Sequence, residues 1–162
     1  MQFSSKEDFD APADEVFRLL SDFRTFEAEA VARGLDLTVP ENRQPEQVGQ
    51  QWVARFKFRG KQRQASIRLT QYDPSEQMRF DINAGGISGT FSIDLIPLSP
   101  QRTRMAVVLH LAPRTVPARI LVQSLRLQKA RLNRRFKLRV AQRVHDLDKR
   151  MTSRTLPPVT KS

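Results

Sequence analysis

Cysteine and histidine, frequent nucleophiles, general bases and metal ligands, are scarce in this sequence. The chain has no cysteine, which excludes disulfides, thiolate metal sites and a cysteine nucleophile. Its two histidines, His110 and His145, have no further ligand at metal-binding spacing. His145 lies close to Asp146 and Asp148, but positions i, i+1 and i+3 of a helix do not converge on one point. We therefore expect no catalytic residue, no metal and no cofactor.

Large apolar side chains that share one face of a predicted sheet are better candidates for a binding site. Aromatic residues alternate with polar ones in several strands, and a helix near the C-terminus carries an apolar stripe. Where such faces meet, they enclose either an ordinary hydrophobic core or a pocket for an apolar molecule. The residues predicted to line a pocket are Trp52, Phe56, Phe58, Phe80 and Phe91 from the sheet, with Leu125, Leu132 and Phe136 from the helix.

A third group of interest is a run of basic residues near the C-terminus. The 162 residues include 28 Lys+Arg and 17 Asp+Glu, a net charge of +11. The acids that follow residue 112 are Asp146 and Asp148, so the excess charge belongs to the C-terminal segment. A basic helix binds phosphates or anionic lipid, or is simply solvated. The residues predicted to contact an anionic surface, either membrane or RNA, are Arg126, Lys129, Arg131, Arg134, Arg135 and Lys137.

The elements that would position these groups follow from the hydrophobic pattern. Residues 2–9 alternate as a strand, and Pro12 opens a helix behind it. A second short helix begins near Asp22 and ends at Gly34, and residues 35–39 are typical of a short strand. These elements place two short helices directly after the first strand.

From residue 51 the apolar residues recur at every second position in five runs separated by short turns, which predicts an antiparallel meander. The glycine-rich segment 85–89 lies in one of these turns, and we interpret it as a hairpin with a bulge. After Pro113 the spacing becomes that of one amphipathic helix, for which we expect a kink or a protruding end. We predict one domain over residues 1–151 and a disordered tail over 152–162.

Two short segments and the order of the elements resemble a known superfamily. The opening Phe9–Phe17, with Leu20 and Asp22, resembles the start of START-like helix-grip proteins, which include polyketide cyclases, lipid-transfer domains and birch-pollen-allergen-like proteins. Gly49–Trp52 is similar to the entry of that superfamily's third strand, and the closing helix matches its order of elements. The resemblance covers about residues 1–150. It implies an α+β fold in which a curved antiparallel sheet of about six to seven strands grips a long C-terminal helix.

The resemblance also implies a cavity between sheet and helix that holds a hydrophobic ligand. We expect binding or carriage of a hydrophobic or lipid-like molecule, with docking on an anionic surface through the basic helix. An enzyme of the cyclase or hydrolase kind in the same cavity stays open, although no residue matches such a motif. An adaptor that binds RNA or anionic membrane is the other alternative. The polar N-terminus shows no signal peptide, so we expect a cytoplasmic protein.

Overall fold

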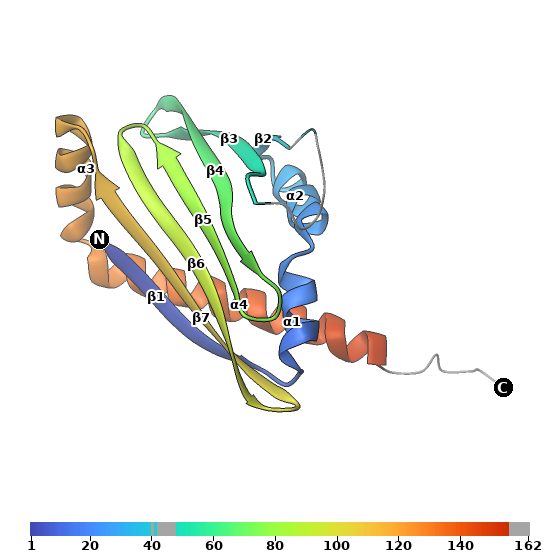
Figure 1. The fold of residues 1–162 in the computed structure, drawn as a ribbon. Helices are drawn as coiled ribbons and strands as arrows, with labels where there is room; N and C mark the ends of the chain where they lie inside the picture. Colours follow the sequence, from blue (N-terminus) through green and yellow to red (C-terminus); the bar gives the residue numbers. More distant parts are fainter. Residues whose placement is uncertain (40, 42–47, 156–162) are drawn as a thin grey trace.

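The computed structural model describes residues 1–39, 41 and 48–155. In these residues the chain forms a seven-stranded antiparallel sheet, two short helices after the first strand, and two helices after the last strand (Figure 1). The strand order is β1-β7-β6-β5-β4-β3-β2, so β2 to β7 form a continuous meander and β1 pairs with the outer side of β7. The predicted α+β fold with its curved sheet and C-terminal helix is confirmed.

The strands alternate buried and exposed positions, as expected for a sheet covered on one face. Their bounds are β1 Gln2–Phe9, β2 Asp36–Thr38, β3 Gln51–Phe58, β4 Lys61–Asp73, β5 Gln77–Ala84, β6 Ile87–Ser99 and β7 Arg102–Pro113. Gly85 and Gly86 join β5 to β6 with φ angles of 51° and 81°, values that suit glycine in a tight hairpin.

The hairpin at the glycine-rich segment is therefore confirmed, but the predicted bulge is not there. The pairing of β5 with β6 runs without a shift from Ala84 opposite Ile87 to Gln77 opposite Asp94. Shifts in register occur instead between Leu69 and Gln71 of β4, and near the β6–β7 turn. Gly89 has another role, since a Cβ atom there would lie 2.7 Å from the His110 carbonyl oxygen.

The helices of the described residues are α1 Ala13–Leu20, α2 Phe23–Ala32, α3 Val116–Arg126 and α4 Lys129–Thr155. Side-chain caps precede α2 and α3. Asp22 caps α2 by accepting hydrogen bonds from the backbone N–H and the hydroxyl of Thr25, at 3.4 and 2.6 Å. Thr115 caps α3 by accepting from the backbone N–H of Ala118 at 3.3 Å.

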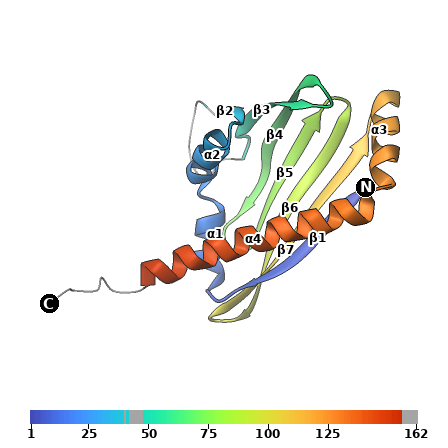
Figure 2. The same cartoon turned by 180° about the vertical axis from the view of Figure 1, so that it is seen from behind.

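The C-terminal helix is broken into two pieces. α3 stands at the end of the sheet and packs against β7, whereas α4 crosses the sheet along β1 (Figure 2). The break lies at residues 127–128, where the Gln128 N–H donates to the Leu125 carbonyl at 3.0 Å. α4 continues to Thr155, so residues 152–155 of the predicted tail are helical. The rest of that tail, 156–162, lies outside the described residues.

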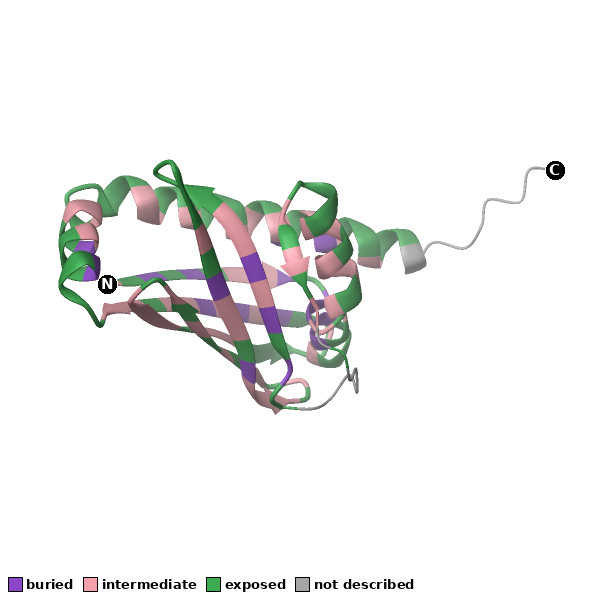
Figure 3. Cartoon of the chain, turned by 90° about the horizontal axis from the view of Figure 1, so that it is seen from above, coloured by how far each residue is buried: buried purple, intermediate pink, exposed green. Residues whose placement is uncertain are grey.

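The core lies where α1 and the second half of α4 meet the sheet. Phe9, Val16, Met78 and Leu147 are fully buried there and belong to one cluster of apolar side chains. Figure 3 shows exposed residues along much of α4, whose remaining face covers the sheet. No helix in the described part of the chain is long and apolar enough to cross a membrane.

Candidate functional site

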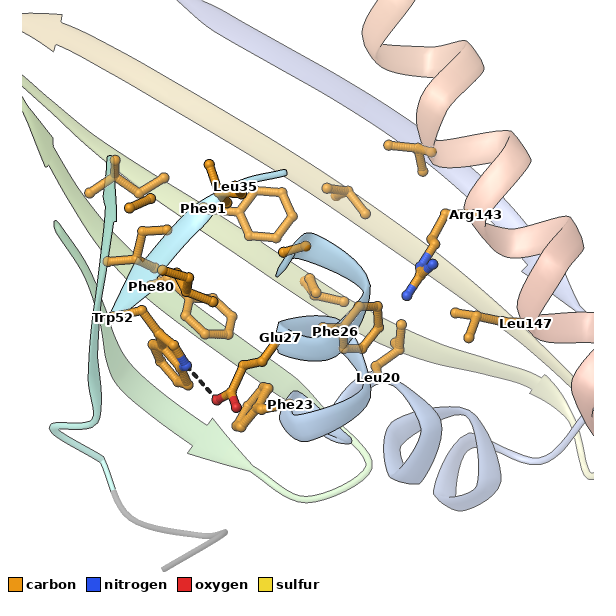
Figure 4. A pocket seen from close by; sticks show the side chains of 18 of the residues that line it. Leu20, Phe23, Phe26, Glu27, Leu35, Trp52, Phe80, Phe91, Arg143 and Leu147 are labelled. Atoms are coloured by element: carbon orange, nitrogen blue, oxygen red, sulfur yellow. Dashed lines mark hydrogen bonds between the residues drawn. The ribbon is translucent and has the colours of Figure 1, made fainter. Parts of the chain in front are cut away.

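Beside this core the structure holds a cavity of about 420 Å³. Its walls come from the concave face of the sheet, from α2 and the end of α1, and from the second half of α4 (Figure 4). The lining is almost entirely apolar, and its ionisable side chains are Glu27 and Arg143. The volume falls within the roughly 300–1,000 Å³ usual for small-molecule sites.

Aromatic rings form one wall of the cavity. Phe23 of α2 meets Trp52 of β3 edge to face, with ring centroids 5.3 Å apart, and meets Phe80 of β5 at 6.0 Å. Phe80 in turn lies 6.2 Å from Phe91 of β6. Tilted and edge-to-face pairs at these distances are favourable, so the rings hold one another in place. The wall is a firm apolar surface that spans three strands and a helix.

Three of the predicted lining residues, Trp52, Phe80 and Phe91, lie in this wall. The alternation of their strands brought them to the concave face, as expected. Contact with a ligand stays a prediction for each of them.

Phe56 and Phe58 share the alternation of Trp52 but are not part of the lining. They lie further along β3, toward its turn to β4, past the region that α2 covers. Phe58 is 37% exposed, and the guanidinium carbons of Arg59 and Arg63 lie 5.5 and 5.8 Å from the centre of its ring. The prediction was wrong for this pair because a strand's phase gives the face and not the position along it.

The three predicted helix residues also lie outside the lining: Leu125 because the helix breaks before α4, and the other two because the start of α4 packs along β1. Leu125 belongs to α3, which packs against β7, and Leu132 lies in the first turns of α4. Phe136 packs on Phe3 of β1, with ring centroids 5.9 Å apart. The lining residues from α4 begin later, at Val140.

Glu27 and Arg143 are the functional candidates that the sequence analysis missed. The Trp52 indole N–H donates to Glu27 Oε1 at 2.7 Å, which fixes both side chains. Arg143 Nη1 forms an ion pair with Glu29 Oε2 at 2.5 Å, and its guanidinium carbon lies 4.3 Å from the centre of the Phe26 ring. A signal for Arg143 was present, since it follows Val140 by three residues within the apolar stripe.

Other titratable groups lie away from the cavity. His110 and His145 are exposed. Burial, and after it the nearby charge of Asp10, raises the pKa of Asp148, but this side chain does not line the cavity. Within the described residues, no three His, Asp or Glu side chains are grouped to hold a metal ion.

Glu29 ties α2, one wall of the cavity, to α4, another wall. Arg150 Nη2 contacts its Oε1 at 2.5 Å while Arg143 holds its Oε2. Hydrogen bonds from Arg150 and from Arg143 hold the pKa of Glu29 below its ordinary value of 4.5, against burial, which raises it. The ionised carboxylate of Glu29 therefore stabilises the contact between α2 and α4.

Replacing Glu29 with glutamine should lower the free energy of unfolding by about 0.5–1 kcal/mol at neutral pH. Because the folded pKa is depressed, this contribution is present above pH 4.5 and is lost as the pH falls through the folded pKa. Urea unfolding of wild type and Glu29→Gln at neutral pH and below pH 4 measures the difference. A difference that stays constant across this range would contradict the assignment.

A cavity between a curved antiparallel sheet and a long C-terminal helix is the arrangement of a helix-grip protein. The sequence model for polyketide cyclase / dehydrase and lipid transport proteins matches residues 1–152, and the chain belongs to this family. Membership supports the assignment of the cavity as a ligand-binding site. A search of the curated proteins found no match to the chain.

Solved structures with low sequence identity share the fold. A protein from Thermus thermophilus has a TM-score of 0.60 at 16% identity, over 96% of this chain and 100% of its own. The Zhui aromatase/cyclase from a Streptomyces species has a TM-score of 0.54 at 16% identity, over 72% of this chain and 70% of its own. Norcoclaurine synthase from Thalictrum flavum, in complex with dopamine and hydroxybenzaldehyde, has a TM-score of 0.56 at 11% identity, over 77% of this chain and 76% of its own.

Proposed function

We propose that the chain binds one hydrophobic small molecule in the 420 Å³ cavity and carries it. The observation that supports this most directly is the lining, which is apolar apart from two side chains on its helices. A cavity of this volume holds several water molecules when no ligand is bound. Such waters would find few hydrogen-bond partners on these walls, so an apolar ligand that displaces them gains affinity.

The firm aromatic wall indicates the shape of the ligand. Trp52, Phe80 and Phe91 offer ring faces and edges on the sheet, and aliphatic side chains of α4 lie across from them. A ligand with a flat or extended hydrocarbon body contacts both surfaces at once. Binding then buries apolar area on both molecules. Each Å² of apolar surface removed from water contributes about 25 cal/mol of favourable free energy.

Trp52 provides the test, because it is the chain's one tryptophan and lies in the cavity wall. Titration with an apolar probe such as naphthalene-sized aromatics or medium-chain alcohols should change its fluorescence and saturate at one molecule per chain. An emission spectrum unchanged by every probe, with no heat of binding by calorimetry, would contradict the proposal.

A second candidate function is catalysis in the same cavity, favoured by the observation that Glu27 and Arg143 both belong to the lining. An acid–base reaction needs an ionisable group in contact with the substrate, and these two side chains are placed to supply one. Two proteins with the same fold carry enzyme names, an aromatase/cyclase and a synthase. Conversion of a bound ligand by wild type, lost in Glu27→Gln, would favour catalysis over carriage.

We also propose that the carrier docks on an anionic membrane through the corner between α3 and α4. The six basic residues predicted for this role, Arg126, Lys129, Arg131, Arg134, Arg135 and Lys137, are all exposed. Among them lie exposed apolar side chains, with Leu127 at 90% and Ile120 and Leu138 also open to solvent. Apolar residues within a basic surface suit lipid better than RNA, for which stacking aromatic side chains are the usual contacts.

Flotation with vesicles tests this docking. Vesicles of phosphatidylcholine with phosphatidylglycerol should retain the protein at low salt and release it at high salt. Leu127→Glu should weaken retention, whereas the matched change Val31→Glu on α2, another exposed apolar position, should not. Equal retention by uncharged vesicles, or a shift of RNA on a gel without vesicle binding, would overturn the membrane assignment.

A further inference from the structure

The Nη2 atom of Arg143 is buried and has no hydrogen-bond partner among the described residues. The side chain extends from α4 toward Phe26 and belongs to the cavity lining (Figure 4). A buried charged donor without an acceptor is unfavourable, and native structures leave few of them unexplained. An acceptor supplied from the cavity would remove this penalty.

The rest of the guanidinium group is held in place. Its Nη1 atom is 2.5 Å from Glu29 Oε2, and its plane is held near the Phe26 ring by a cation–π contact at 4.3 Å. A fixed donor loses little conformational entropy when an acceptor arrives. Arg143 is therefore held in position to bind, with its Nη2 nitrogen available to a ligand.

The position of Arg143 favours an anionic acceptor. Its carboxylate partner, Glu29, is shared with Arg150, whose charge Asp22 and Asp146 also offset. Among the described residues that line the cavity, Arg143 is the one cationic side chain. The acidic side chain of the lining, Glu27, lies on the Trp52 side of the cavity and not on the α4 side (Figure 4). An anionic group is therefore attracted toward α4 and repelled from the Trp52 side, which orients the ligand.

We propose that the ligand of this cavity is an apolar monocarboxylate whose carboxylate oxygen accepts a hydrogen bond from Arg143 Nη2. This inference rests on the proposed function, binding of an apolar molecule in the same cavity. The Nη2 nitrogen, with its two N–H groups, suits a singly charged carboxylate, whereas a phosphate would bring more acceptors into a lining that offers few other donors. The hydrocarbon part lies against the aromatic wall.

Two probes of equal chain length, decanoate and decanol, test the assignment by calorimetry at neutral pH. Arg143→Met should lower the affinity for decanoate about tenfold or more and leave that for decanol within about twofold. Arg150→Met is the matched control, because Arg150 contacts the same Glu29 but does not line the cavity, and it should change both affinities by less than about threefold.

Each outcome decides between the claims. Equal affinity losses for decanoate and decanol, or no loss for decanoate, would overturn the role of Arg143 while leaving the apolar cavity site intact. Failure of the wild type to bind either probe would contradict the proposed function itself. If Arg143→Met does not fold, Arg143→Gln retains a polar side chain and serves in the same comparison, with melting temperatures as the check on folding.

Discussion

Replacing Ala54 with phenylalanine is expected to abolish or strongly weaken binding of apolar molecules in the cavity, by about tenfold or more in Kd. Ala54 lies on β3 beside Trp52, is 6% exposed, and directs its methyl group into the lining. A ring in its place occupies the space that the proposed ligand needs. Calorimetry with decanol and fluorescence of Trp52 measure the loss.

Val53→Phe is the matched control, because the neighbouring residue points to the opposite face of the same strand. It should leave binding within about twofold. Ala54→Phe is also expected to cost up to about 1–3 kcal/mol if the ring does not fit fully into the cavity. Undiminished binding by a folded Ala54→Phe protein would place the ligand elsewhere.

The largest loss of stability is expected from Leu147→Ala, at about 2–5 kcal/mol. Leu147 is 2% exposed and packs in the core cluster that joins α1, the sheet and the second half of α4. Because Leu147 also lines the cavity, its truncation enlarges the cavity and weakens the attachment of α4. Urea unfolding followed by circular dichroism gives the free energy.

The same substitution on the other face of the helix isolates burial from helix propensity. Leu138 is 70% exposed, so Leu138→Ala should change the free energy of unfolding by less than about 0.5 kcal/mol. Equal effects of the two substitutions would mean that α4 does not pack on the sheet as described.

The meander and the two short helices were predictable because each rests on local information. Alternation defines a half-buried strand, and Asp22 and Gly34 mark the ends of α2 with side-chain and backbone chemistry that acts within a few residues. The break between α3 and α4 was not located, since residues 127–128 contain neither proline nor glycine. There the packing of α3 against β7 and of α4 along β1 decides the chain direction.

The alternation of the strands predicted which face of the sheet lines the cavity, but not where along the strands the cavity lies. Trp52 and Phe58 have the same phase on one strand, yet one lies under α2 and the other beyond it. Arg143 is a basic residue in a basic helix, and its inward position depends on Glu29 and Phe26 of a distant helix. Contacts between segments so far apart in the chain leave no local sequence pattern. The polar residues of the site were therefore identified only from the structure.

Native mass spectrometry of the protein purified from its own host tests the central claim most directly. We expect a mass excess of one small molecule per chain that is released on unfolding, and we expect Ala54→Phe prepared in the same way to lack it. The bare mass of the chain in the wild type, or the same adduct on Ala54→Phe, would contradict a ligand site in this cavity.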